Sequence, residues 1–308
     1  MAGIHLDTDI GSDTDDACAL AMLTGWPDVE IVAVTTTIDP GGRRAGFVAR
    51  CLELAGRVDI PVVAGAEVSM TTGQFPGTIP DDGRYWDASV TARPSPPGAA
   101  VARLHASVQA GATIVAIGPY TNLAALEIEK PGSLGRVPVV LMGGFVQTTD
   151  PGLPTFRPDM DWNVQCDPYA AEVVFAAASH LTLVTIPAAC KAHLRRSHLV
   201  RLRAAGPLGA LLAGQAEAYA FDNGIAELAR VHTGLPDDLL NFQYDAVACA
   251  VAAGWSGATI EQTSLSAVLD DGVLRFEPDR HGRPTRVVVD IDADDFTTRW
   301  FEAIERSL

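Results

Sequence analysis

The stretch DTDIGSDTDDA, residues 7–17, places five carboxylates within eleven positions, directly after the apolar run GIHL at residues 3–6. A short apolar run that stops at polar residues is typical of a buried strand followed by a loop. Carboxylates this close together repel one another, so their charged forms are disfavoured unless a cation lies among them. The stretch therefore predicts the first strand of a buried sheet, with a candidate cation-binding loop at its carboxyl end.

The rest of the N-terminal half alternates between strand-like and helix-like segments. Short runs rich in Val, Ile and Leu predict buried strands at residues 31–36, 60–64, 113–117, 137–142 and 181–186. Helical patterns lie between or after them, at residues 17–23, 45–54, 99–110, 122–128 and 169–178. This alternation predicts an α/β fold, with an open, doubly wound, mostly parallel sheet and helices on both faces.

After Pro187 the pattern changes. Longer helical patterns cover residues 208–221 and 246–253, a strand pair is expected at 264–269 and 286–291, and a closing helix begins at Phe296. No linker rich in Pro, Gly or Ser divides the chain, so we expect residues 1–308 to form a single domain. The stretches richest in Pro and Gly, residues 71–87, 94–98 and 144–159, are interpreted as long loops of the kind that often cover binding sites.

Composition narrows the class of protein. The chain has 308 residues, 48% of them hydrophobic, and a formal net charge of −16, which opposes binding to nucleic acid or to an anionic membrane. Its five cysteines form no CxxC pair, so we expect buried, reduced thiols and a cytoplasmic location. No apolar stretch reaches the roughly 20 residues of a membrane span, and no signal-peptide pattern is present.

The acidic loop has the ligand chemistry of a hard cation. In open α/β sheets, ligands bind at the carboxyl ends of the strands, where this loop lies. Carboxylates without Cys or His among them favour Ca²⁺ or Mg²⁺ over zinc. A plain acidic cap for the next helix would explain Asp15 and Asp16 but not the other carboxylates. The spacing lacks the Gly and Glu of an EF-hand loop.

A phosphatase is an alternative interpretation of the same loop. In haloacid-dehalogenase-like phosphatases, an Asp-x-Asp pair after the first strand supplies a nucleophile and its acid partner, as Asp7 and Asp9 could do here, and Lys191 could face a phosphate. Against this, Gly11 stands where that motif usually has Thr or Val, and the chain has no Gly-rich phosphate loop.

Six ordered motifs carry a resemblance to a known family. They are DTDIGSDTDDA, VTTT at residues 34–37, AIGPYTNLA at 116–124, VVLMGG at 139–144, DWNVQCDPYAA at 161–171 and YDAVA at 244–248. In order and approximate spacing, the chain resembles the inosine-uridine-preferring nucleoside hydrolases over nearly its whole length.

The resemblance implies a set of site residues. Asp9, Asp16 and Asp245 match the carboxylate ligands of one Ca²⁺, and Ile117 matches a ligand that binds through its backbone carbonyl. Asp9 would also orient and deprotonate the attacking water. The positions that match ribose-binding residues are Asp15, Asn163, Asp161 and Met142.

Three positions depart from the family pattern. Tyr244 stands where inosine-uridine types often have a His that can act as general acid, so an aromatic ring could instead stack on the base. Asp161 replaces the usual Glu, and Asp39 with Pro40 replaces the usual Asn after VTTT. Other candidates for the base pocket are Trp86, His232, Phe221, Trp162, Tyr219 and His193.

The resemblance thus implies a calcium-dependent enzyme that splits a ribonucleoside into ribose and a free purine or pyrimidine base, in base salvage. Its only expected partners are the small-molecule substrate and further copies of the chain, as a homo-oligomer (dimer or tetramer). The departures at Tyr244 and Asp161 keep a second hypothesis open, a protein that binds the ribosyl group without hydrolysing it.

Overall fold

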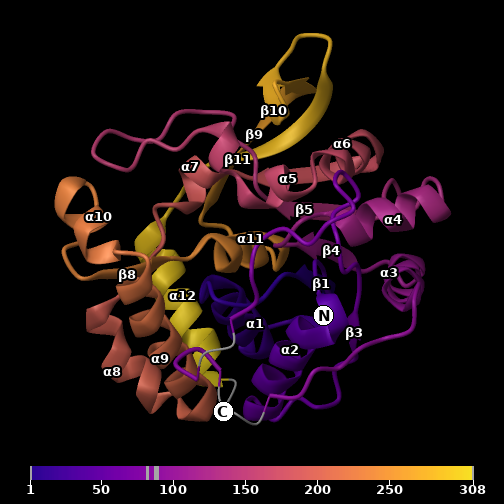
Figure 1. Cartoon of the computed structure of the whole chain (residues 1–308). Coiled ribbons are helices and arrows are strands. Elements are labelled where there is room, and N and C mark those ends of the chain that lie inside the picture. Colours follow the sequence, from indigo (N-terminus) through magenta and orange to yellow (C-terminus); the bar gives the residue numbers. More distant parts are fainter. Residues whose placement is uncertain (1, 81–82, 87–89, 307–308) are drawn as a thin grey trace.

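The structure is a computed structural model, and it describes residues 2–80, 83–86 and 90–306 (Figure 1). Within these residues, nine strands form one sheet in the order β10-β9-β11-β6-β5-β4-β1-β2-β3. Their bounds are β1 (Ala2–Thr8), β2 (Val29–Thr36), β3 (Val62–Ala64), β4 (Thr113–Ala116), β5 (Pro138–Met142), β6 (His180–Val184), β9 (Ala258–Asp270), β10 (Val273–Pro278) and β11 (Arg283–Ile291).

The sheet is parallel from β3 to β11, and β9 pairs antiparallel with both β10 and β11. The predicted doubly wound, mostly parallel sheet is confirmed. Because the chain runs outward from β1 in one direction to β3 and in the other from β4 to β6, the order reverses between β1 and β4. In open α/β sheets, ligands bind in the crevice at such a reversal.

Helices cover both faces of the sheet (Figure 1). The helices are α1 (Asp15–Gly25), α2 (Arg43–Leu54), α3 (Ala99–Gln109), α4 (Thr121–Glu129), α5 (Trp162–Cys166), α6 (Pro168–Ala177), α7 (Ile186–Ala189), α8 (Leu199–Ala204), α9 (Gly206–Asp222), α10 (Ile225–Val231), α11 (Tyr244–Ala252) and α12 (Ala293–Arg306). Successive side chains along a strand point into different cores. Val115 and Val140 lie in the core with α1, α2, α9, α11 and α12, whereas Ile114 and Val139 lie in the core with α3, α4 and α6. Short 3₁₀ turns are η1 (Pro40–Gly42), η2 (Pro158–Met160) and η3 (Arg196–His198).

The C-terminal part contains more strands than the sequence indicated. The expected pair is β9 with β11, but β9 is 13 residues long and also pairs with β10, which the sequence analysis missed. These two strands form a hairpin that projects from the body (Figure 1). A second small sheet, β7 (His193–Arg195) with β8 (Leu239–Phe242), was also not predicted.

The loop predicted at residues 71–87 has no helix or strand in its described residues, and Asp87 lies outside the described part. All five cysteines are buried and unpaired, as expected. No helix among the described residues is long and apolar enough to cross a bilayer.

Candidate active site

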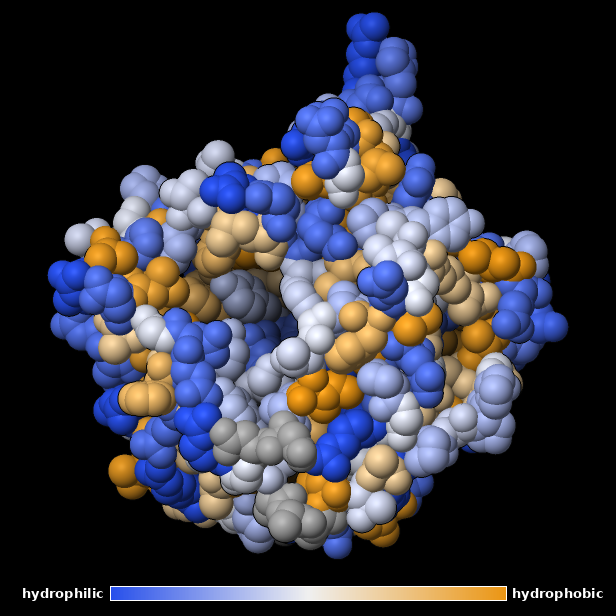
Figure 2. All heavy atoms as spheres, viewed as in Figure 1, coloured by the Kyte–Doolittle hydropathy of each residue, from blue (hydrophilic) through white to orange (hydrophobic). Residues whose placement is uncertain are grey.

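A cavity of about 540 Å³ opens at the carboxyl ends of β1, β4 and β5, and Figure 2 shows it as a hollow on this face of the molecule. It therefore lies at the reversal of strand order. The acidic loop, the ends of three strands and the starts of α1, α2, α5, α7 and α11 contribute to its wall. The lining residues are Asp9, Gly11, Ser12, Asp13, Asp15, Asp16, Arg44, Gly77, Thr78, Ile117, Met142, Gly143, Phe156, Met160, Asp161, Trp162, Asn163, Ile186, Tyr219, Asn223, Tyr244 and Asp245.

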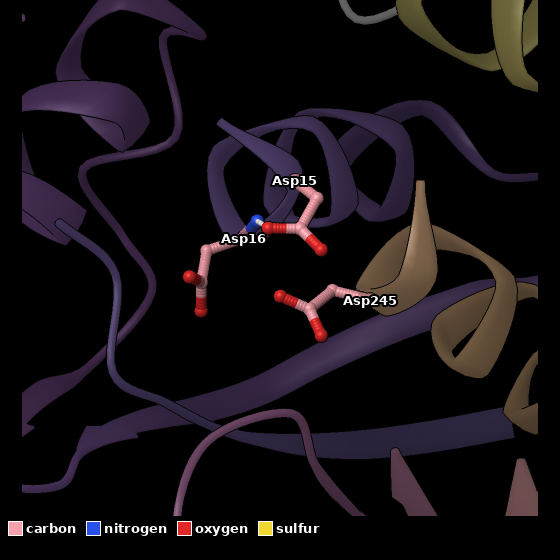
Figure 3. A group of neighbouring side chains, drawn as sticks. All are labelled: Asp15, Asp16 and Asp245. Carbon is pink, nitrogen blue, oxygen red and sulfur yellow. Dashed lines mark hydrogen bonds between the residues drawn. The ribbon is translucent and has the colours of Figure 1, made fainter. Parts of the chain in front are cut away.

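Three carboxylates converge on the floor of this cavity. Asp15 and Asp16 begin α1, and Asp245 is the second residue of α11, so residues about 230 positions apart meet (Figure 3). One carboxylate oxygen from each lies within 4.8 Å of the other two, and all three side chains are buried. We call Asp15, Asp16 and Asp245 the carboxylate cluster.

The electrostatics of the carboxylate cluster are unfavourable without a counterion. Burial raises the pKa of Asp15, Asp16 and Asp245 well above the ordinary value, and repulsion from neighbouring carboxylates adds to this. Two charges 4.8 Å apart repel by about 3 kcal/mol at an effective dielectric constant near 20. The two helix N-termini offset part of this cost. The cluster must therefore hold either protons or a cation.

Asp9 lies in the same cavity wall but outside the carboxylate cluster. Its Oδ2 accepts a hydrogen bond of 2.9 Å from the indole Nε1 of Trp162. A Cβ added to Gly118 would lie 2.7 Å from both the Asp9 backbone nitrogen and its Oδ1, so only glycine leaves room for Asp9 there. Burial raises the pKa of Asp9, and the charge of Arg44 opposes the rise.

Behind the cavity, polar side chains support the loop from within the sheet. Thr8 donates a hydrogen bond through Oγ1 to Asp16 Oδ1 and accepts one from the Ile10 backbone. Asp7, fully buried, accepts hydrogen bonds at Oδ2 from Thr35 and, at 2.8 Å, from Asn122. Burial raises the pKa of Asp7 to about 7.

Arg44, in the first turn of α2, also contributes to the cavity wall, although the sequence analysis did not single it out. It is the only basic residue among the described lining residues, and it is buried. Its guanidinium donates to the backbone carbonyls of Asp9, Ile10 and Ile38. A lone Arg at the start of a helix gives no sequence signal of such a role.

Three of the four predicted sugar-binding residues, Asn163, Asp161 and Met142, lie together near the ends of β4 and β5, and the fourth, Asp15, belongs to the carboxylate cluster. The Asn163 amide donates hydrogen bonds of 3.0 Å to the carbonyls of both Ile117 and Met142. The Asp161 carboxylate accepts from the backbone nitrogens of Gly144 at 2.6 Å and Val164 at 3.2 Å, which makes it the N-cap of α5. Burial raises its pKa to about 6.

The candidates for the base pocket divide into two groups. Tyr244, Trp162 and Tyr219 line the cavity, and the Tyr244 ring stacks on Phe242 with centroids 5.3 Å apart. The others lie away from the lining. Trp86 is stacked on Phe47 in the core, with ring centroids 4.1 Å apart. Its indole nitrogen also donates a hydrogen bond to the Gly11 carbonyl, which holds the ring away from the cavity.

Phe221 is 82% exposed at the end of α9, and His232 is the C-cap of α10. His193 packs edge-on against Phe242 behind the wall. Phe156 and Met160, which the sequence analysis did not consider, do line the cavity. They come from the long loop after β5, where no periodic pattern indicates which side chains point inward.

Comparison with known proteins agrees with this geometry. The sequence pattern of the family described as "Inosine-uridine preferring nucleoside hydrolase" matches residues 4–298. The chain belongs to this family. It is therefore an enzyme, a nucleoside hydrolase, and the resemblance inferred from the six motifs is confirmed.

Individual relatives of this nucleoside hydrolase differ in their named preference. The pyrimidine-specific ribonucleoside hydrolase RihA of Klebsiella pneumoniae subsp. pneumoniae is 29% identical over 220 residues, 68% of each chain. A plant nucleoside hydrolase shares the fold with a TM-score of 0.79 and 24% identity, covering 98% of each chain. A purine-preferring ribonucleoside hydrolase from Gardnerella vaginalis also has a TM-score of 0.79, with 20% identity and 98% coverage of each chain.

The family assignment leaves the phosphatase alternative without support. Lys191, which that interpretation required near a phosphate, instead pairs with Asp150 and Asp290, each at 2.6 Å. It is not among the described residues that line the cavity of this nucleoside hydrolase.

Proposed function

We propose that this nucleoside hydrolase uses a Ca²⁺ ion in the cavity to hydrolyse the N-glycosidic bond of a ribonucleoside, giving ribose and a free base. The observation that carries the proposal is the carboxylate cluster. Three buried carboxylates within 4.8 Å of one another must hold protons or a cation, and in a cavity open to small molecules we propose the cation.

The donor set fits a hard cation. Carboxylate and carbonyl oxygens, with no His or Cys among the described lining residues, are the ligands of Ca²⁺ and Mg²⁺. We propose Asp16 and Asp245 as ligands, with Asp9 and the Ile117 carbonyl completing the site. Asp15 belongs to the same cluster, so it is placed either to bind the ion directly or, as the resemblance implies, to bind a ribose hydroxyl beside it.

Each residue then has a chemical task. A calcium ion held by these residues would supply a positive charge that attracts the ribose hydroxyls and lowers the pKa of a nearby water. Asp9 accepts the proton of the attacking water at its carboxylate, which Trp162 holds in place by the 2.9 Å hydrogen bond. The surrounding carboxylates favour the positive charge that develops on the ribosyl ring as the bond to the base breaks.

The aromatic part of the cavity wall suits a flat base. The Tyr244 ring is backed by Phe242 and by Phe156, whose centroid is 6.4 Å away, so the Tyr244 ring is held in position beside the cavity. Burial raises the pKa of its hydroxyl well above the ordinary value, so the group stays protonated and can donate a hydrogen bond to the leaving base.

Asp161 is expected to contribute less to sugar binding than the family's usual Glu. Both of its oxygens already accept hydrogen bonds from backbone nitrogens. We therefore propose that Asn163, Met142 and the ion hold the ribose, while Asp161 chiefly fixes the start of α5.

An assay of common nucleosides with and without metal tests the proposal. Purified protein is stripped with a chelator and dialysed, and release of free base from inosine, uridine, adenosine and cytidine is measured before and after adding Ca²⁺ or Mg²⁺. We expect activity to be lost on stripping and restored by Ca²⁺. The variant D9N should bind Ca²⁺ more weakly, because a neutral amide replaces a charged ligand, and at saturating Ca²⁺ it should still lose about 100-fold in kcat.

Activity that survives complete metal removal would overturn the mechanism. Calorimetric binding of ribose, with no base released over long incubation, would instead favour the binding protein. The exposed variant D159A is the matched control, because that carboxylate pairs with Arg157 outside the cavity.

By family resemblance we also infer a cytoplasmic homo-oligomer, dimer or tetramer, acting in base salvage. Light scattering of the purified protein tests the oligomeric state, and a monomer at all concentrations would contradict it.

A further inference from the structure

We propose that Arg44 is a positioning residue for the ion site, which it shapes by clamping the backbone that carries Asp9. This inference rests on the proposed function, because it concerns the same ion. Arg44 is 4% exposed, and its Nε donates to Ile38 O at 2.8 Å. Its Nη1 donates to Ile10 O at 2.9 Å and to Asp9 O.

The three carbonyls come from two different connections of the fold. Asp9 and Ile10 follow β1, and Ile38 follows β2, so one guanidinium ties together the ends of two adjacent strands at the cavity. Ile38 has a φ of +49°, a conformation that β-branched residues rarely adopt. The planar fork of donors on an Arg can satisfy such divergent carbonyls, whereas a Lys ammonium cannot match that geometry.

The packing around the clamp is close. A Cβ added to Gly11 would lie 2.7 Å from Arg44 Nη1, so the acidic loop passes directly over the guanidinium. Residues 9–11 are thereby held in one path, and the Asp9 side chain leaves that path toward the cavity. Asp39 fixes Arg44 in turn, by accepting a hydrogen bond of 2.7 Å from its backbone nitrogen.

Charge and geometry predict opposite effects for this residue. A positive guanidinium in the wall of a cation site repels the cation, so if Arg44 acted through its charge alone, removing it would tighten ion binding. If Arg44 acts by positioning, removing it lets the Asp9 turn relax and weakens binding. Loss of supporting contacts around a metal site typically costs 10- to 100-fold in affinity.

The chain offers a matched control in Arg283. This residue of β11 also donates its guanidinium to three backbone carbonyls, those of Phe175, Ala176 and Ala178, at the end of α6. Removing it breaks a clamp of the same kind, but none of its partners lines the cavity. R283A therefore reports what general loosening of the structure does to ion binding.

The experiment measures Ca²⁺ binding to chelator-stripped protein by calorimetry, for the wild type, R44A, R44K and R283A. We expect R44A to bind Ca²⁺ at least 10-fold more weakly, R44K to remain weakened although it keeps the charge, and R283A to match the wild type. Low millimolar guanidinium ion should restore part of the affinity of R44A and none of it in R44K. Circular dichroism verifies that each variant is folded, and if R44A does not fold, R44K carries the comparison.

The outcomes separate the two proposals. Wild-type binding with an unaffected or tighter R44A overturns the positioning role and leaves the proposed function standing. Equal losses in R44A and R283A also overturn it, because they show a general effect of stability. A wild type that binds no Ca²⁺ overturns both.

Discussion

His5 lies fully buried in β1, two residues before Asp7, in a chain of polar side chains. Its Nδ1 lies 2.8 Å from Ser107 Oγ and its Nε2 lies 3.0 Å from Thr35 Oγ1, and Thr35 in turn donates to Asp7. Burial lowers the pKa of His5 to about 3. The imidazole therefore stays neutral in the folded protein at every pH at which the enzyme is expected to work.

This burial makes the folded state sensitive to acid. In the unfolded chain His5 takes up a proton as the pH falls through about 6.5, whereas the folded protein excludes that proton until about pH 3. Acid therefore favours unfolding, by about 2 kcal/mol between pH 7.5 and pH 5. Glutamine does not titrate, so between pH 7.5 and pH 5 we expect the free energy of unfolding to fall by about 2 kcal/mol less in H5Q than in the wild type. Urea titrations at both pH values measure this difference. Equal falls in the two proteins would contradict the prediction.

At the residue scale, the sequence predicted the polar residues that follow strands better than the aromatic ones. Asp15 and Asp16 follow β1 and line the cavity, because the carboxyl ends of parallel strands share one edge of the sheet. Asp245 and Asn163 also line it, but they begin α11 and α5, and only the family resemblance pointed to them. Trp86 does not, because an aromatic side chain on a long loop packs into the core as readily as into a pocket. No periodicity distinguishes the two outcomes.

Among the elements, the long loop after β3 is anchored in part by one buried carboxylate. Asp167, the N-cap of α6, accepts hydrogen bonds from the Met70 backbone at 2.8 Å, from the Thr71 backbone at 3.0 Å and hydroxyl at 2.7 Å, and from the Thr121 hydroxyl at 2.7 Å. The same loop continues to Gly77 and Thr78 in the cavity wall. Asp167 therefore connects the position of that wall to α6.

We expect D167A to destabilise the protein by about 3 kcal/mol, since several buried donors lose their partner. Amide exchange at residues 66–80 should accelerate, and KM should rise more than kcat falls, because the wall is displaced while the carboxylate cluster remains. Hydrogen exchange by mass spectrometry and steady-state kinetics measure these effects. D159A, which removes an exposed ion-pair partner, should leave the free energy of unfolding nearly unchanged. Unchanged exchange in that loop would exclude the anchoring role.

The elements that the sequence predicted are the ones with a strong period or a long apolar run. Buried parallel strands such as β4 and β5 are apolar on both faces, so they are visible in the sequence. The β9–β10 hairpin alternates weakly and is largely exposed, and β7 and β8 are only three and four residues long. Their pairing depends on contacts distant in the sequence, which no local pattern reveals.

At the scale of the whole molecule, the fold brings two helix N-termini and their carboxylates to the place where the strand order reverses. This convergence links stability, pH and ion binding. In the ion-free protein the raised pKa values of Asp15, Asp16 and Asp245 mean that the carboxylate cluster keeps its protons to a higher pH than free carboxylates do. A cation must displace those protons in order to bind.

Two results are therefore expected when the ion is added or removed. Ca²⁺ at 100 times its Kd should add about 2.7 kcal/mol to the free energy of unfolding and raise the Tm by several degrees, and a chelator should reverse this. The affinity for Ca²⁺ should rise as the pH rises above the range in which free carboxylates titrate, because fewer protons remain to be displaced. Calorimetry in buffers of different ionisation enthalpy measures the protons released. D245N, with one carboxylate removed, should show both weaker Ca²⁺ binding and fewer released protons. A Ca²⁺ affinity that does not change with pH would contradict the prediction, because it would show that the ion displaces no protons from the carboxylate cluster.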